Sequence, residues 1–147
     1  MPTPDIFLDT SALFAGLWSA SGGGRMLLKL GEAGAIRLLV SSHVLTEIEN
    51  VLRRKSPESL GVLALILHQS QITVTANGEV EHLTVCQSLI TYPADALIVA
   101  AAWSAGADCF VTLDRQHLLE NPSLHQAVPF SIGTPGDCLN WYRSQLT

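Results

Sequence analysis

The stretch YPADALIVAAAWSAGADCFVTLDRQHLL, residues 92–119, decides the fold that this chain can adopt. It contains a nearly charge-free helical pattern over residues 94–105 and then a nearly charge-free strand at residues 109–112. A short apolar strand without alternating polarity is typical of a parallel sheet whose two faces are both covered. Asp95 nevertheless opens the helix, and Asp114 follows the strand. The segment therefore predicts a buried parallel sheet and leaves two isolated carboxylates to explain.

Outside this stretch, short apolar runs alternate with helical patterns along the chain. The predicted strands are residues 6–8, 36–40, 72–75, 109–112 and 130–132. The predicted helices are residues 24–32, 44–55, 57–69, 80–89, 94–105 and 135–145. Residues 21–24, Ser-Gly-Gly-Gly, are expected to form a mobile loop. Strands separated by helices predict an α/β fold, a Rossmann-like three-layer α/β/α sandwich with a central parallel sheet of about five strands.

Length and composition limit the classes of protein to consider. With 147 residues, the chain is expected to form a single domain over residues 1–147. Hydrophobic residues make up 48% and charged residues only 14%, which argues against disorder and favours self-association. The net charge of −5 argues against a protein that coats nucleic acid passively. It leaves room for an enzyme that handles nucleic acid through a metal ion.

The cysteines and the N-terminus indicate a cellular compartment. Cys86, Cys109 and Cys138 are odd in number and widely spaced, so they predict neither a disulfide framework nor a zinc site and fit a reducing cytosol. The opening MPTPDIFLDTS lacks the basic region and long apolar run of a secretory signal. No apolar run reaches membrane-spanning length. We therefore expect a soluble, cytoplasmic protein with no membrane partner.

Four acidic residues are predicted to meet at one edge of the sheet. Asp9 directly follows the first strand, Asp114 follows the fourth, and Asp95 lies in the first turn of the helix that leads into that strand. Glu47 and Glu49 flank the apolar face of the helix at residues 44–55 on opposite sides. Glu47 is preferred because it lies closer to the helix start, which faces the carboxyl ends of the strands. Ligands of such sheets collect at this edge.

Each acid also has a simpler explanation. Asp9 and Asp114 could cap short helices that follow them, and Asp95 could interact with the macrodipole of its helix. Glu47 could be a solvated residue on a helix flank. Taken together, however, the acids need a counter-ion, since two carboxylates about 5 Å apart repel by roughly 3 kcal/mol at an effective dielectric near 20. A divalent cation removes this repulsion.

The surrounding residue types narrow the choice of cation. Carboxylates without an accompanying histidine or cysteine pair suit Mg²⁺ or Mn²⁺ better than zinc. Ser11 and Thr112 place hydroxyls beside Asp9 and Asp114, where they can orient a carboxylate or a bound water. The five histidines show no ligand pair at helical or strand spacing, so core or surface roles are expected for them.

Four segments resemble the PIN-domain ribonucleases, a family that includes the VapC-type toxins of toxin–antitoxin operons. They are DTSAL (9–13), VLTEIENVL (44–52), the PADALIVAAAWSAGADCFVTLDRQHLL part of the opening stretch (93–119), and FSIGTPGDCLNWY (130–142). The resemblance runs from residue 6 to about residue 142. The third segment is its most specific part.

The resemblance implies a function and a site. The four acids Asp9, Glu47, Asp95 and Asp114 would form a catalytic Mg²⁺ or Mn²⁺ site, with Ser11 and Thr112 as small polar residues beside it. The implied activity is hydrolysis of RNA phosphodiester bonds, usually by a homodimer, and an antitoxin protein would be the partner of a toxin. Many members carry another acid at the position of Gln116, which weakens the case for a second metal position.

Candidate RNA contacts and one alternative function remain to be weighed. Arg53 and Arg54 belong, with Lys55, to the one basic cluster of the sequence, and Arg115 lies beside the site. A basic trio at a helix end also has a simpler role, because it interacts favourably with the helix macrodipole. The alternative to a nuclease is a PIN-fold module that binds RNA or protein without cutting.

Overall fold

A computed structural model describes residues 2–146 of the chain. Its five strands form one sheet in which every neighbouring pair is parallel. The strands are β1 (Asp5–Leu8), β2 (Arg37–Ser41), β3 (Thr73–Thr75), β4 (Cys109–Val111) and β5 (Ser131–Gly133). They lie in the order β3-β2-β1-β4-β5. The predicted α/β fold with a parallel five-stranded sheet is therefore confirmed, and each predicted strand lies within one residue of an observed one at either end.

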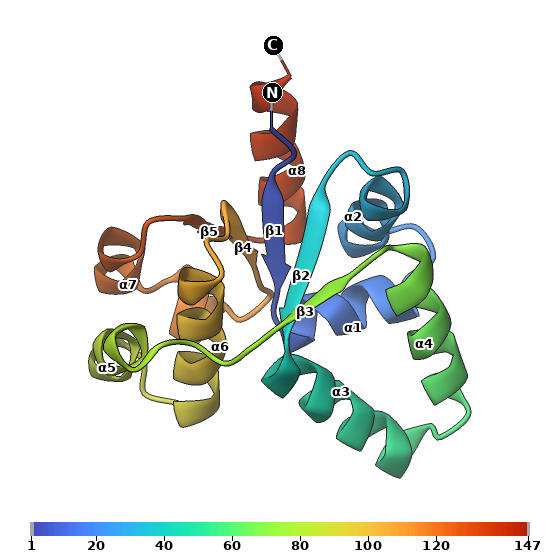
Figure 1. The fold of residues 1–147 in the computed structure, drawn as a ribbon, viewed down its shortest axis with the longest axis horizontal. Coiled ribbons are helices and arrows are strands. Elements are labelled where there is room, and N and C mark those ends of the chain that lie inside the picture. Colours follow the sequence, from blue (N-terminus) through green and yellow to red (C-terminus); the bar gives the residue numbers. More distant parts are fainter. Residues whose placement is uncertain (1, 147) are drawn as a thin grey trace.

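Helices connect the strands and cover both faces of the sheet. They are α1 (Thr10–Trp18), α2 (Gly23–Glu32), α3 (Ser42–Lys55), α4 (Ser59–Gln69), α5 (Val80–Leu89), α6 (Pro93–Ser104), a π-helical turn η1 (Arg115–Leu119), α7 (Pro122–Ala127) and α8 (Pro135–Gln145). Helices α5, α6 and α7 lie on one side of the sheet and α1 to α4 on the other, while α8 packs against α2, β4 and β5 (Figure 1). None of the helices within residues 2–146 combines the length and the apolarity that crossing a lipid bilayer requires.

The core explains why residues 94–105 contain almost no charge. Helix α6 packs on β2 and against α5, so most of its surface is covered. Its buried residues are Ala96, Ile98, Val99, Ala100, Ala101 and Ala102. Across the sheet, the rings of Phe7, Phe110 and Phe130 stack with centroid separations of 5.5 and 6.0 Å. The segment that decides the fold thus forms the centre of the molecule.

The carboxyl ends of β1, β2 and β4 meet at one edge of the sheet, at the lower side of Figure 1. Leu8 pairs with Val111 in the ladder, and the Asp9 amide extends the pairing by donating to the Val111 carbonyl at 3.1 Å. Helix α3 begins directly after β2, and α6 runs back toward β4, so that both present their N-terminal turns to this edge. The predicted acids are distributed over these elements.

The structure corrects the prediction for residues 21–24. Gly23 and Gly24 are not loop residues, because they form the first turn of α2. Gly24 is buried where α2 crosses α1, and a Cβ there would lie 2.9 Å from the Gly16 backbone nitrogen. Glycine at this crossing lets the two helix backbones approach each other. Helix α1 itself was not among the predicted helices.

Candidate functional site

Asp9 is the most deeply buried acid of the site, with 6% of its surface exposed. It caps α1 by accepting a hydrogen bond from the Ala12 amide at 2.9 Å, and the same oxygen, Oδ1, accepts from Ser11 Oγ at 2.7 Å. Burial raises the pKa of the Asp9 carboxyl, while bonds from Thr112, Ser11 and Ala12 oppose the rise. Asp9 therefore does cap α1, and the cap uses only Oδ1 and not the second carboxylate oxygen.

Two hydroxyls fix the ends of β1 and β4 relative to each other. Thr112 is fully buried; its Oγ1 accepts from the Asp114 amide at 3.0 Å and its side chain is hydrogen-bonded to Asp9. Ser11 Oγ accepts from the Leu113 amide at 3.0 Å while donating to Asp9. These contacts connect segments that lie about a hundred positions apart in the sequence, and they place Asp9 and Asp114 side by side.

Asp114 caps the π-helical turn η1. Its Oδ1 accepts from the His117 amide at 3.1 Å, and the His117 ring nitrogen Nδ1 lies 3.2 Å from both carboxylate oxygens. Single π-type turns occur most often at functional sites. Here the turn brings the side chain at position 117 back onto the carboxylate at position 114.

Asp95 is the third residue of α6 and is half-buried. Its pKa is raised from 3.8 to about 6, first by burial and then by the nearby charges of Asp114 and Asp9. Glu47 adds a smaller contribution of the same sign, and His117 opposes the rise. Because the charges of three other acids raise the pKa of Asp95, the four acids form a single cluster.

The structure places Glu47, and not Glu49, at this cluster. Val44, Ile48 and Leu52 form the buried face of α3. Glu47 lies on the side of α3 that faces Asp9 and Asp114, whereas Glu49 pairs with Arg53 at 3.7 Å on the other side.

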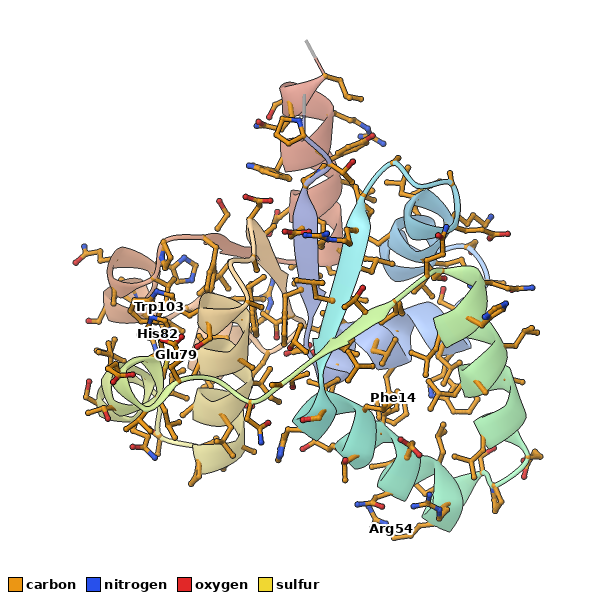
Figure 2. The ribbon with its side chains drawn as sticks, in the orientation of Figure 1. Phe14, Arg54, Glu79, His82 and Trp103 are labelled. Atoms are coloured by element: carbon orange, nitrogen blue, oxygen red, sulfur yellow. The ribbon has the colours of Figure 1, made fainter. Side chains whose placement is uncertain are left out.

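The acids line a single cavity of about 310 Å³. Its walls are Asp9, Thr10, Ser11, Phe14, Glu47, Asp95, Ile98 and Asp114. Figure 2 shows Phe14 between α1 and α3, on the side of the sheet opposite Trp103. The Oγ1 atom of Thr10 is buried and has no hydrogen-bond partner among the described residues. A wall with four carboxylates and an unsatisfied hydroxyl fits a site that is completed by an ion and its water.

The donor set is suited to a divalent cation. Carboxylate oxygens are the ligands that Mg²⁺ and Mn²⁺ prefer. One ligand atom from each of Asp95, Asp114 and His117 lies within 4.8 Å of the other two. The residues present therefore fit a metal ion, and the pKa of Asp95 is raised first by burial and then by the charges gathered around it.

The candidate RNA contacts lie outside the cavity wall. Arg53 and Arg54 are exposed at the C-terminal end of α3, where Arg53 bonds to Glu49 and Asn50, and Arg54 to the Asn50 carbonyl. Figure 2 shows Arg54 at the end of α3 that points away from the sheet. Arg115 is exposed directly after Asp114. The structure brings together the acids and the hydroxyls but not these three arginines.

Two histidines near the acids were not anticipated. His117 contacts Asp114. The Nε2 atom of His43 lies 3.9 Å from Glu47, and it is buried without a hydrogen-bond partner within residues 2–146. Histidines were considered as metal ligands only where two of them share an element, whereas each of these histidines lies beside an acid. The signal was the spacing of histidine and acid, i,i+4 for His43 and Glu47 and i,i+3 for Asp114 and His117.

Comparisons with known proteins identify the family and the fold. Residues 5–116 match the family model of the PIN domain. No curated protein was found to match the sequence. Among solved structures, VapBC from Salmonella typhimurium has a TM-score of 0.67 at 16% identity, covering 90% of this chain and 99% of that one. VapBC2 from Rickettsia felis has a TM-score of 0.63 at 16% identity, covering 88% and 96%.

A third structure shares the fold over a smaller part of the chain. VapC20 from Mycobacterium tuberculosis, described as a toxin that cleaves the sarcin-ricin loop, has a TM-score of 0.52 at 20% identity. The match covers 76% of this chain and 91% of that one. At identities this low the solved structures show a shared fold alone. The family model, in contrast, matches most of the sequence. The chain therefore belongs to the PIN-domain family.

Proposed function

We propose that this protein is a Mg²⁺- or Mn²⁺-dependent endoribonuclease that hydrolyses phosphodiester bonds in RNA. The observation that carries the proposal is the convergence of Asp9, Glu47, Asp95 and Asp114, from four separate elements, on one cavity. Membership of the PIN-domain family supports it, as does the fold shared with VapC20, which is described as a toxin that cleaves the sarcin-ricin loop.

The roles of the residues follow from their positions. A divalent cation, when bound, supplies Lewis acidity that lowers the pKa of water and offsets charge on the leaving oxygen. Asp9 and Asp114, held by Ser11 and Thr112, would form the rigid part of its ligand set. Asp95 and Glu47, which line the same cavity, would complete the set and would orient the attacking water or accept its proton. In-line attack on phosphorus would leave a 5′-phosphate on the product.

Substrate phosphates need cationic partners beyond the metal. We propose Arg115 as the nearest one, since it is exposed and adjacent in sequence to Asp114. Arg53 and Arg54 lie just under two turns of α3 beyond Glu47 and would contact RNA only at a distance from the cleaved bond.

The direct test is a cleavage assay on RNA with Mn²⁺, with and without EDTA. Asp9→Asn should abolish cutting, because it removes the most buried charge of the cavity while keeping the size of the side chain. Glu81→Gln, in the exposed first turn of α5, is the matched control and should retain activity. Intact RNA under every condition, from protein shown to be folded, would favour a PIN-fold module that binds RNA or protein without cutting.

We further propose that the nuclease acts as the toxin of a toxin–antitoxin pair, as a cytoplasmic homodimer. The support is the fold shared with the VapBC structures. Induced expression of the wild-type chain in a bacterium should arrest growth, and Asp9→Asn should not. Equal growth of the two strains at equal protein levels would speak against the toxin role, and light scattering tests the dimer.

A further inference from the structure

We propose that His117 is a nitrogen ligand of the bound cation, and that it makes the site prefer Mn²⁺ to Mg²⁺. The inference rests on the proposed metal-dependent function and deepens it. It adds an imidazole to a site that was expected to contain oxygen ligands alone.

The position of the His117 ring is fixed by the structure on three sides. The His117 amide donates to Asp114 Oδ1, which fixes the turn, and Asn121 Nδ2 donates to the His117 carbonyl at 3.1 Å. Asn121 also donates to the Leu89 carbonyl at the end of α5, so the turn is attached to a neighbouring helix. The ring of Tyr92 meets the imidazole edge to face at 4.4 Å. An incidental surface histidine would have none of these restraints.

The distances fit adjacent ligands of one ion. His117 Nδ1 lies 3.2 Å from both oxygens of Asp114, and Asp95 offers an oxygen within 4.8 Å of both groups. In an octahedron with metal–ligand bonds of about 2.1 Å, neighbouring ligand atoms are about 3 Å apart and opposite ones about 4.2 Å. The three atoms are therefore close enough for small side-chain shifts to bring them into one coordination sphere.

The proton balance is simple. A ligand nitrogen must present a lone pair to the ion, so Nδ1 would bind in its unprotonated form. The single proton of the neutral ring would then lie on Nε2, the nitrogen that does not face Asp114.

The chemistry of the ligands gives the metal preference. Mg²⁺ is bound almost entirely through oxygen, whereas imidazole nitrogen suits ions later in the first transition row, and Mn²⁺ accepts both. The cavity wall does not include His117, and its polar side chains are carboxylates and hydroxyls. His117 is therefore the residue that would distinguish the two cations.

A different role for His117 makes a different prediction. If the ring only donates a hydrogen bond that orients Asp114, its removal should weaken the binding of Mg²⁺ and Mn²⁺ by the same factor. If the ring is a ligand, its removal should weaken Mn²⁺ binding selectively.

The test is calorimetric titration of the metal-free full chain with MnCl₂ and MgCl₂, for wild type and His117→Phe. Phenylalanine keeps an aromatic ring against Tyr92 and removes the nitrogen. His68→Phe, exposed on α4, is the matched control. We expect His117→Phe to weaken Mn²⁺ binding about tenfold, a typical loss for a change at a metal site, with Mg²⁺ changed less than about twofold. The control should bind both ions as wild type does.

Pulsed electron paramagnetic resonance of the Mn²⁺-loaded wild type gives a readout that needs no variant. A ¹⁴N coupling from a directly bound imidazole is expected, and it should vanish in His117→Phe. Mn²⁺ binding without ¹⁴N coupling, or equal loss of both metals, would overturn this inference and leave the proposed nuclease standing. Absence of Mn²⁺ binding in the folded wild type would overturn both.

Discussion

At the scale of one residue, burial and the neighbouring acids raise the pKa of Asp95 and so make the stability of the fold depend on pH. Its folded-state pKa of about 6 lies above the ordinary value of 3.8, so the folded protein binds the proton more tightly than the unfolded chain does. Its contribution to stability is therefore fully present below pH 3.8 and is lost as pH rises to about 6. The metal-free protein should become less stable across this window.

Asp95→Asn should reverse that loss. Above pH 6, in EDTA, we expect the free energy of unfolding to rise by about 1 kcal/mol, a value reduced for the partial exposure of the side chain. The pH dependence between 4 and 6 should flatten. Urea unfolding at several pH values measures both effects, with Glu81→Gln as a control that keeps the slope. A destabilised Asp95→Asn protein at pH 7 would contradict the argument.

Thr112 allows a separate test of the hydrogen bonds that hold Asp9 and Asp114 in place. Thr112→Val keeps the shape of a fully buried side chain but removes the hydroxyl that bonds to Asp9 and accepts from the Asp114 amide. We expect a loss of about 1–3 kcal/mol in unfolding free energy, because a buried carboxylate and an amide lose a partner. Thr84→Val, exposed on α5, should change stability by less than about 0.5 kcal/mol. Equal stabilities of the two variants would sink this reading of Thr112.

The positions of the acids could be predicted, whereas the π-type turn that brings His117 onto Asp114 could not. Asp9 and Asp114 each follow an apolar strand, and parallel strands end at a common edge whatever the details of packing. His117 reaches Asp114 only because residues 115–119 form a π-type turn, and no periodicity in RQHLL indicates one. Local backbone geometry of this kind is set by the surroundings, here the bonds made by Asn121.

At the scale of elements, the crossing of the chain over α6 depends on one glycine. A Cβ on Gly78 would lie 2.5 Å from both the carbonyl carbon and the oxygen of Ala100, which are backbone atoms of a buried helix and cannot yield. Gly78→Ala should therefore lower the unfolding free energy by about 2–3 kcal/mol, as overpacking does. The shift in the urea midpoint measures it.

Gly61 provides the matched control for Gly78. It lies in α4, and a Cβ there would meet nothing within 4 Å. Gly61→Ala should raise stability by about 0.5–1 kcal/mol, because alanine loses less backbone entropy in a helix. If both alanine variants shifted stability in the same direction, close approach at Gly78 would not be the cause.

Two parts of the fold that the sequence failed to predict, α1 and the start of α2, share a physical cause. The segment TSALFAGLW of α1 is apolar on nearly all sides, since it packs against α2, α3 and α4, and so it lacks the amphipathic pattern that marks a surface helix. The start of α2 reads as a loop because glycine disfavours helices, yet the crossing with α1 requires Gly24. In both cases tertiary packing overrides local preference. Helix α6 was predicted because it is long and charge-free.

At the scale of the whole molecule, a cation should act on folding as well as on catalysis. The fold collects four of the chain's 13 acids in one cavity, and the unfolded chain disperses them, so a cation binds the folded state far better. Such a ligand adds about 2.7 kcal/mol of stability at a concentration one hundred times its dissociation constant.

Mn²⁺ should therefore raise the melting temperature of the wild type and of Glu81→Gln. Asp9→Asn and Asp95→Asn should gain little from Mn²⁺, although Asp95→Asn starts from a higher value in EDTA. Crossing of the Asp95→Asn and wild-type stabilities as Mn²⁺ is added is the sharpest form of the prediction, because simple damage to the fold cannot produce it. Parallel melting curves for all variants would show that the carboxylates share an edge of the sheet without sharing an ion.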